Sequence, residues 1–397
     1  MGHKYWKRRH GIKLFYILAL AFVLTIALFP GAGAHAETSG DYVYSVVGGK
    51  ARIDVYNGRA EHLIILDTLD GYPVAEIGAA AFLMCGTLKT VTIPPSVVNI
   101  GAQAFDSCTN LRSVVVPEGV RSIGERAFTG CAALASVTIP ESVSSIGRLA
   151  FLECTGLAEI DIKNKTIGGA MFANCSGLKS VNFGENLTNI GDEAFFNCIS
   201  LETLMFPESL RSIGDGAFFG CSGLGDVIFY NPGTNFESSS TNYNRRDYIV
   251  PTFAEADNIT AIYAFDGSLA HRYALRNDIG YVPIASVDLD GRRLKFDAPP
   301  IIEGGRTLVP MRAIFEAFGA EIAWDGATRT VTATAPGKTI VMRIGDPVML
   351  VDGVPVELDV PPQIVLERTL VPVRAVSESF GATVDWDDGA KNVIIRR

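Results

Sequence analysis

Seven cysteines are the residues most able to do chemistry in this chain, because thiolates serve as nucleophiles, redox groups and metal ligands. They recur every 23 residues, with one interval of 21, and none has a second cysteine at short spacing. Zinc sites usually need such pairs. An odd number of cysteines at one repeat position, each flanked by apolar residues, predicts buried free thiols rather than disulfides. They are Cys85, Cys108, Cys131, Cys154, Cys175, Cys198 and Cys221.

Other groups that could support catalysis are scarce. After residue 36 the chain keeps two histidines, His62 and His271, with no acidic or cysteine ligand pattern near either. The sequence has no Gly-x-Ser-x-Gly nucleophile elbow and no phosphate-binding glycine loop. We therefore predict no catalytic residue, no cofactor and no metal site, and we predict that the protein is not an enzyme.

The cysteines mark successive turns of a sequence repeat, and the fold of this repeat determines where the other side chains lie. A phenylalanine stands three residues ahead of every cysteine, and a glycine stands four residues ahead of every phenylalanine. In the first period the alternation of Val91 and Ile93 predicts a short strand that ends at Pro94, and the stretch from Ile100 to Phe105 predicts a tight turn or short helix. A fixed period of this length indicates a solenoid in which equivalent side chains stack between coils.

These motifs resemble a known family. The pattern Leu-x-x-Val-x-Ile-Pro, followed by Ile-Gly-x-x-Ala-Phe-x-x-Cys, is similar to the BspA-like (treponemal type) leucine-rich repeats of bacterial surface proteins, and it covers residues 73–229 in seven copies. The resemblance implies a leucine-rich-repeat solenoid and a role at the cell surface. In the fifth copy Lys163-Asn164-Lys165 replaces the proline segment and two residues are missing, which predicts a local irregularity.

One surface of the solenoid is a candidate binding face. If Val91 and Ile93 point inward, their neighbours and the equivalent residues of later coils point outward, because side chains alternate along a strand. The outward column is mostly small and polar, and acidic in the middle coil. A plain solvated face is the alternative. The candidate residues are Thr90, Thr92, Ser113, Ser136, Thr138, Glu159, Asp161, Ser180, Asn182, Thr203 and Asp226.

The N-terminal segment is typical of an export signal. Basic residues precede an apolar run from Leu14 to Phe29, and Ala34-His35-Ala36 supplies small residues for cleavage near Ala36. The run is short for a membrane span, so we expect no transmembrane segment in the mature chain, with an uncleaved anchor as the alternative. The expected location is secreted or cell-wall associated.

The chain is acidic, with a formal net charge of −9. Binding to nucleic acid or to anionic membranes depends on clustered lysine and arginine, so neither is an expected partner.

The C-terminal third contains a second duplication. Residues 297–333 recur 62 positions later, and each half predicts a strand, a helix near 311–318 or 373–380, and a hairpin with its turn at Asp325-Gly326 or Asp388-Gly389. Residues 286–397 resemble the copper amine oxidase N-terminal-like domain. The resemblance implies an accessory α+β module without the catalytic quinone or copper histidines.

The charged residues that recur in both halves of this duplication can be interpreted in two ways. Arg312 and Arg374, with Asp325 and Asp387, form either a ligand clamp or, as we prefer, internal ion pairs beside core tryptophans.

The predicted fold is multidomain: a leucine-rich-repeat solenoid of about seven coils with caps, followed by a small α+β domain made of a duplicated half. The expected segments are a signal peptide (1–36), an N-terminal cap (37–80), the repeats (81–229), a C-terminal cap and linker (230–285) and the C-terminal module (286–397).

The expected function is non-enzymatic binding or adhesion at the cell surface, with a protein or polysaccharide ligand and the C-terminal module as attachment or spacer. The alternatives are a passive envelope scaffold and an accessory subunit of a secreted enzyme.

Overall fold

The structure is a computed structural model that describes residues 36–236 and 252–397. The predicted signal peptide therefore lies, up to residue 35, outside the described residues. The described chain divides into two compact units. The second unit comprises Thr203–Arg211, Gly225–Asn235 and Asn258–Arg397, and the first unit contains the rest.

An antiparallel hairpin begins the first unit, as the alternation around Gly48-Gly49 predicts. Strands β2 and β3 form it, β1 adds on the outer side of β2, and β6 continues the sheet in parallel to β3. A short strand, β5, pairs with β6. The bounds are β1 Ala36–Ser39, β2 Tyr42–Val47, β3 Lys50–Tyr56, β5 Thr68–Leu69 and β6 Tyr72–Ile77.

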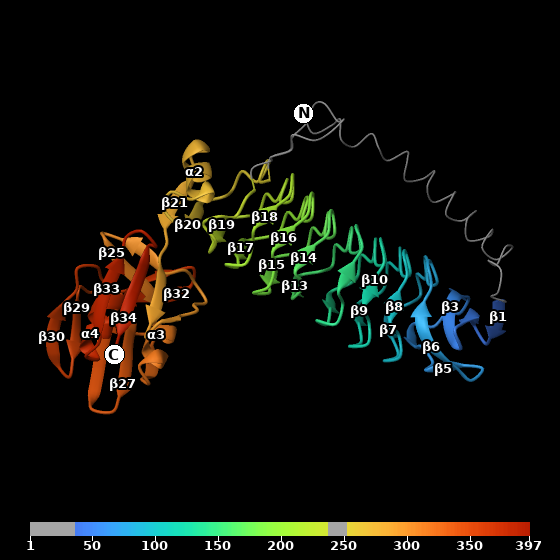
Figure 1. Cartoon of the computed structure of the whole chain (residues 1–397), viewed down its shortest axis with the longest axis horizontal. Helices are drawn as coiled ribbons and strands as arrows, with labels where there is room; N and C mark the ends of the chain where they lie inside the picture. The colour runs from blue at the N-terminus through green and yellow to red at the C-terminus, as the bar shows by residue number, and fades with distance from the viewer. Residues whose placement is uncertain (1–35, 237–251) are drawn as a thin grey trace. The chain divides into compact units, whose positions relative to one another are not determined.

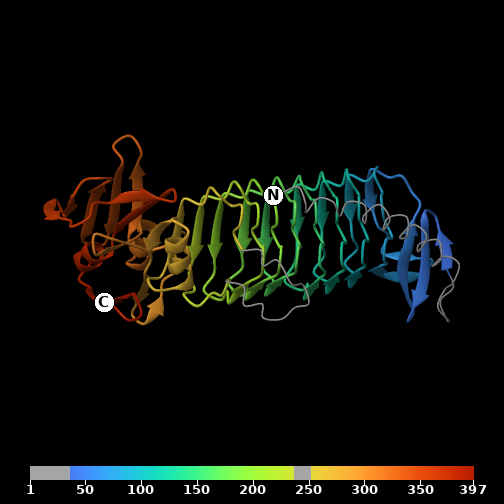
Figure 2. The same cartoon turned by 90° about the horizontal axis from the view of Figure 1, so that it is seen from above.

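Two columns of short parallel strands form the solenoid of the first unit (Figures 1 and 2). The first column is the predicted one and contains β4 His62–Ile64, β7 Thr90–Thr92, β9 Ser113–Val115, β11 Ser136–Thr138, β13 Glu159–Ile162 and β15 Ser180–Phe183. The second column was not predicted. It contains two-residue strands: β8 Asn99–Ile100, β10 Ser122–Ile123, β12 Ser145–Ile146, β14 Thr166–Ile167, β16 Asn189–Ile190 and β18 Ser212–Ile213.

A stack of aromatic rings fills the core between the columns. Neighbouring repeat phenylalanines lie with their ring centroids 4.8–5.4 Å apart and nearly parallel. Tyr56 of the hairpin extends the stack at one end, at 5.1 Å from Phe82, and Phe253 extends it at the other, at 5.5 Å from Phe218. The ring stack thus continues beyond the seven predicted coils. The sequence period hid Phe253 because a long insertion separates it from Phe218.

The segments after each second-column strand are turns, not helices. They follow a repeated hydrogen-bond pattern, such as Ala127 N–H to the carbonyl of Gly124 and Phe128 N–H to the carbonyl of Ala150 in the next coil. A Cβ on Gly124 would lie 2.4 Å from the backbone nitrogen of Ala102, so the coils could not approach this closely with a larger residue there. This contact explains the Ile-Gly signature of the repeat.

The fifth coil is irregular, as predicted. Strand β11 does not pair with β13, and β12 does not pair with β14, so both ladders of the described chain break at the same level. The turns remain connected, because Phe151 donates its N–H to the carbonyl of Met171 across the break.

A parallel sheet begins the second unit. Strands β17 Thr203–Phe206, β19 Asp226–Phe229, β20 Ala261–Ala264 and β21 Gly280–Pro283 form one parallel sheet. Helix α2, Leu269–Arg276, lies between β20 and β21 in the chain, and Ser268 caps it by accepting the N–H of His271. The sequence from Ala261 to Tyr263 and from Ser268 to Asn277 resembles a closing strand and helix after such repeats, and β20 and α2 form there.

The C-terminal domain contains three sheets and two short helices. The helices, α3 Met311–Ala317 and α4 Val373–Ser379, begin directly after prolines, as predicted. Two sheets join the halves, with orders β23-β22-β34-β33 and β24-β25-β32-β31. Their strands are β22 Ser286–Leu289, β23 Arg292–Arg293, β24 Ile301–Glu303, β25 Arg306–Pro310, β31 Gln363–Val365, β32 Arg368–Pro372, β33 Thr383–Asp387 and β34 Asn392–Arg396.

The third sheet of this domain is an antiparallel meander. It contains β26 Glu321–Asp325, β27 Thr330–Ala335, β28 Lys338–Arg343, β29 Val348–Val351 and β30 Val354–Glu357. Both predicted hairpins form, β26 with β27 and β33 with β34. Their left-handed residues are Arg329 and Lys391, not the predicted glycines, because aspartate side chains bend the turns by accepting backbone N–H groups.

Among residues 36–236 and 252–397, no helix combines the length and apolar character needed to cross a bilayer.

Candidate functional site

The first strand column of the first unit presents the predicted face. Along β7, β9, β11, β13 and β15 the central and following apolar side chains are buried, while the residues between them point outward, so the predicted register is correct. Thr92, Ser136, Thr138, Glu159, Asp161, Ser180 and Asn182 are exposed, and Thr90 and Ser113 are partly buried.

Backbone pairing fixes the order of these side chains. Thr90, Ser113 and Ser136 are register partners across β7, β9 and β11, and Thr92 and Thr138 flank Val115 in the parallel row. On the other side of the break, Glu159 is aligned with Ser180 and Asp161 with Asn182. Because strands of one sheet lie about 4.8 Å apart, the face offers a hydroxyl, amide or carboxylate at each step.

Sequence reasoning missed the first strand of this face. Strand β4 pairs in parallel with β7, and it places His62 beside Thr90 and Ile64 beside Thr92. His62 Nδ1 lies 2.9 Å from Thr90 Oγ1. Ile64 is 73% exposed and Val115 is 65% exposed, so this end of the face is partly apolar. The apolar, β-branched run Leu63-Ile64-Ile65 was a usable strand signal, but it stood in the segment that we assigned to the cap.

Two predicted face residues lie in the second unit, and their strands are more covered. Thr203 and Asp226 are partly buried. Ile228, which the alternation places outward beside Asp226, is fully buried in a cluster with Tyr263, Phe265 and residues of the C-terminal domain. The outward position is therefore wrong for Ile228, because residues distant in the sequence cover this side of β19.

The second strand column carries its own polar ladder. Ser122 donates its hydroxyl to Asn99 Oδ1 at 2.8 Å, and the Asn189 amide donates to the Ser212 hydroxyl at 2.6 Å. These side chains satisfy one another across neighbouring coils. The first column differs, because among the described residues the exposed hydroxyls of Ser136 and Thr138 have no hydrogen-bond partner and remain available to a ligand.

The repeat cysteines have a structural role. In six coils the Sγ atom donates to the carbonyl of the phenylalanine one coil earlier, as Cys131 does to Phe105 at 3.2 Å. Burial raises the pKa of Cys131, Cys175 and Cys221 to about 12, which keeps these thiols protonated. Cys85 differs, because it is only partly buried and a hydrogen bond with Cys108 lowers its pKa.

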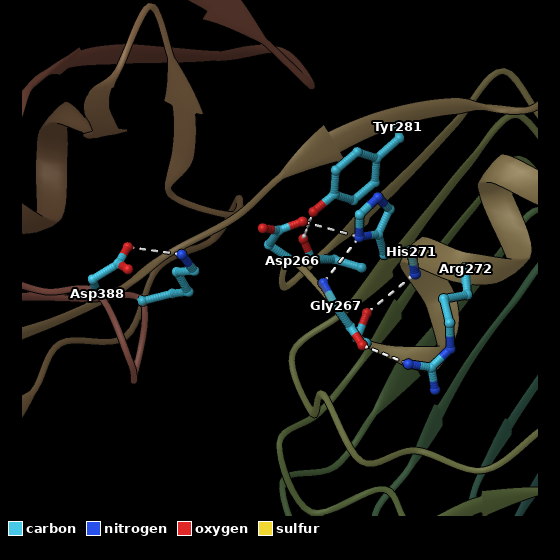
Figure 3. Close-up of polar contacts among 9 residues, drawn as sticks. Asp266, Gly267, His271, Arg272, Tyr281 and Asp388 are labelled. Atoms are coloured by element: carbon cyan, nitrogen blue, oxygen red, sulfur yellow. Dashed lines mark hydrogen bonds and ion pairs between the residues drawn. The ribbon is translucent and has the colours of Figure 1, made fainter.

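His271 occupies a hydrogen-bonded cluster in the second unit (Figure 3). Its Nδ1 accepts the Gly267 N–H at 2.9 Å and lies 3.0 Å from Asp266 Oδ1, and its ring stacks on Tyr281 with centroids 3.9 Å apart. Burial raises the pKa of Tyr281, so its hydroxyl remains protonated and contacts the Ala264 carbonyl at 3.2 Å. The imidazole closes the first turn of α2 and braces β21, which is a structural role.

The reciprocal ion pairs of the C-terminal domain are not those predicted. Arg306 contacts Asp359 and Arg368 contacts Asp297, each at 2.5 Å, so each half supplies the partner of the other. Among the described residues, neither Arg312 nor Arg374 forms an ion pair.

The predicted partners of those arginines have other contacts. Asp325 accepts the N–H of Ala327 and the Thr328 hydroxyl, and these bonds lower the pKa of Asp325. The tryptophans are not core residues either: Trp324 is 45% exposed and Trp386 is 39% exposed.

No group of three or more histidine, cysteine or acidic side chains in the described part of the chain is arranged to hold a metal ion.

Comparison with known families matches two parts of the chain. A model described as the BspA type leucine rich repeat region matches residues 75–166 and 160–268, in six copies. A model described as the copper amine oxidase N-terminal domain matches residues 288–395. The comparison with curated proteins gave no match.

Several solved structures are similar to the repeat region. A leucine-rich repeat protein from T. pallidum is 31% identical, with 48% of this chain and 91% of that chain covered and a TM-score of 0.44. A leucine-rich cell surface protein from Faecalibacterium prausnitzii is 25% identical, with coverage of 59% and 72% and a TM-score of 0.49. A leucine-rich repeat protein from Bacteroides ovatus is 24% identical, with coverage of 58% and 71% and a TM-score of 0.41.

Proposed function

This chain belongs to the BspA-type leucine-rich repeat family and carries a copper amine oxidase N-terminal domain, and we propose that it is a non-enzymatic binding protein of the cell exterior. The first strand column of the solenoid contacts an extended partner, a protein or a polysaccharide, and so mediates adhesion. The C-terminal domain serves as an attachment or spacer module.

The outward row of β11, β13 and β15 is the observation that carries this proposal. Six side chains on these strands are exposed and polar, while the alternate residues are anchored in the core. Parallel ladders hold β13 in register with β15 and β11 in register with β9, so binding would order few protein groups and would lose little conformational entropy. Such a preorganised row of donors and acceptors suits a partner that lies across several coils. The six are Ser136, Thr138, Glu159, Asp161, Ser180 and Asn182.

The chemistry of the described residues supports a binding role over an enzymatic one. The imidazole of His271 is engaged by the backbone of Gly267 and by Tyr281, and the buried thiols are held protonated in hydrogen bonds to carbonyls. A general base or a nucleophile must instead reach a substrate. The exposed carboxylates Glu159 and Asp161 favour a partner that carries basic or hydroxyl groups over a nucleic acid.

A matched pair of variants tests the face. Ser136→Arg/Thr138→Arg places two bulky cations on the first column, and Ser145→Arg places one on an exposed position of the second column. We expect the double variant to lose at least about tenfold in affinity for cell-wall or host-matrix material in a pull-down, since buried charge without a partner opposes binding. The Ser145→Arg control should bind like the wild type. If the double variant and the Ser145→Arg control bound this material equally well, the assignment of the binding face would be contradicted.

Cell fractionation with N-terminal sequencing of the mature protein tests the proposed location. We expect a mature N-terminus near Ala36 in the medium or wall fraction. Recovery of the intact chain only in the cytosol would contradict it.

A further inference from the structure

The sheet that forms the binding face has an open edge at its first strand. The strand order is β11-β9-β7-β4, so among the described residues β4 pairs on one side only. In the second column, by contrast, the sheet continues beyond β8 through β6 and then through the hairpin strands β3 and β2 to β1. The first column therefore stops earlier than the second.

The hydrogen bonds of β4 show which backbone groups remain open. The Thr90 N–H donates to the Glu61 carbonyl at 3.1 Å, and the Ile65 N–H donates to the Thr92 carbonyl at 3.0 Å. The odd-numbered residues therefore face β7. Because backbone groups of successive residues alternate in direction along a strand, the N–H and C=O groups of His62 and Ile64 point to the open edge.

The side chains at this edge are apolar and exposed. Ile64 is 73% exposed and Leu66 is 52% exposed, whereas Ile65 between them is buried. Edge strands are normally protected by proline, charge or a cover. The exposed edge strand β30 of the C-terminal domain contains Pro355, which has no N–H to offer, but β4 contains neither proline nor a charged residue.

We propose that the edge of β4 binds a partner polypeptide as an added strand, which identifies the ligand class of the solenoid as an extended peptide. The outward N–H and C=O groups of His62 and Ile64, at strand spacing, match a peptide backbone, and a polysaccharide has no such alternating groups. Apolar side chains at alternate positions of the peptide would cover Ile64 and Leu66. This inference rests on the proposed binding role and adds its ligand class and its docking strand.

The test uses the full chain and a labelled peptide that copies residues 87–94, the segment that pairs with β4 in the native array. We expect saturable binding by fluorescence anisotropy, and slower hydrogen exchange of the His62 and Ile64 amides in the complex. A scrambled peptide of the same composition should bind at least about tenfold more weakly.

Two matched substitutions test the open edge. Ile64→Lys and Ile199→Lys both replace an exposed apolar residue by lysine, but Ile199 lies in a turn outside both strand columns. Ile64→Lys should weaken peptide binding at least about tenfold, and Ile199→Lys should leave it within about twofold. Ile64→Pro removes one outward N–H without breaking the ladder to β7, and it should also weaken binding. Melting curves like that of the wild type verify the fold of each variant.

Absence of peptide binding by the wild type, or equal weakening by Ile64→Lys and Ile199→Lys, would overturn the edge proposal. Either result would leave the proposed binding role to be decided by the Ser136→Arg/Thr138→Arg pull-down, so the two failures are distinguishable.

Discussion

Phe128 lies in the middle of the ring stack, fully buried between Phe105 and Phe151 at 5.3 and 5.4 Å. Phe128→Ala should lower the free energy of unfolding by about 3–5 kcal/mol, because it removes a large buried side chain and leaves a cavity. The exposed Thr138→Ala should change it by less than about 0.5 kcal/mol. Urea denaturation of both variants measures these differences, and similar losses would show that the inside and outside positions are interchanged.

The thiols should separate into one reactive and six unreactive groups. In the native protein at pH 8, iodoacetamide should modify Cys85 first, because it is partly exposed and its pKa is lowered by Cys108. The other thiols should react at least about a hundredfold more slowly, since burial raises the pKa of groups such as Cys131 to about 12.

Mass spectrometry of the alkylated peptides checks this order. All seven cysteines should react once the protein is unfolded without reductant. Disulfide-linked peptides from neighbouring coils, or early modification of Cys131, would contradict the buried-thiol assignment.

At the residue scale, the sequence predicted which strand side chains are buried and which are exposed, because this depends only on the local alternation of apolar residues. The alternation that buries Val91 and exposes Thr92 follows from strand geometry alone. The alternation could not predict the burial of Ile228, because Tyr263 and Phe265, which come later in the sequence, cover this side chain. Nor could it predict the cross-half pairing of Arg306 with Asp359, since several acidic residues of the duplication were equally plausible partners.

At the element scale the break in the fifth coil should have a dynamic consequence. Strand β13 pairs with β15 but not with β11, so its amides that face β11 lack a ladder partner. We expect these amides to exchange with solvent at least about tenfold faster than those that face β15. Hydrogen exchange followed by NMR resolves the two sets, and equal protection would mean that the ladder is continuous in solution.

The same break shows why elements differ in predictability. Lys163-Asn164-Lys165 departs visibly from the repeat, so an irregularity could be predicted there. The two-residue strands of the second column could not, because Asn99 and Ile100 leave no periodic signal of their own. Strand β4 was missed because it precedes the first full copy of the repeat.

At the scale of the whole molecule, the C-terminal domain should fold only when both halves are present. Strands β25 and β32 pair across the duplication, as do β22 and β34. A fragment of residues 286–340 should therefore be largely unfolded by circular dichroism, and residues 286–397 should unfold in one transition.

The cluster around Ile228 refines this expectation. Ile301 and Leu308 pack with Tyr263 and Phe265, so residues 258–397 should melt at a higher temperature than residues 286–397. Equal melting temperatures would show that this cluster adds no stability.

Copper should not bind tightly to residues 286–397. This segment contains no histidine and no cysteine, which leaves only oxygen ligands. Stoichiometric, tight uptake in calorimetry would contradict the accessory role of the domain and would reopen an enzymatic function.

The central claim is that the first strand column of the solenoid is where the protein meets its partner. Hydrogen exchange on the full chain, alone and loaded with the material that it captures from cell-wall or host-matrix extracts, tests it most directly. The account predicts slower exchange in β4, β7, β9, β11, β13 and β15 of the loaded protein, with the second column unchanged. Protection confined to the C-terminal domain, or to the second column, would contradict it.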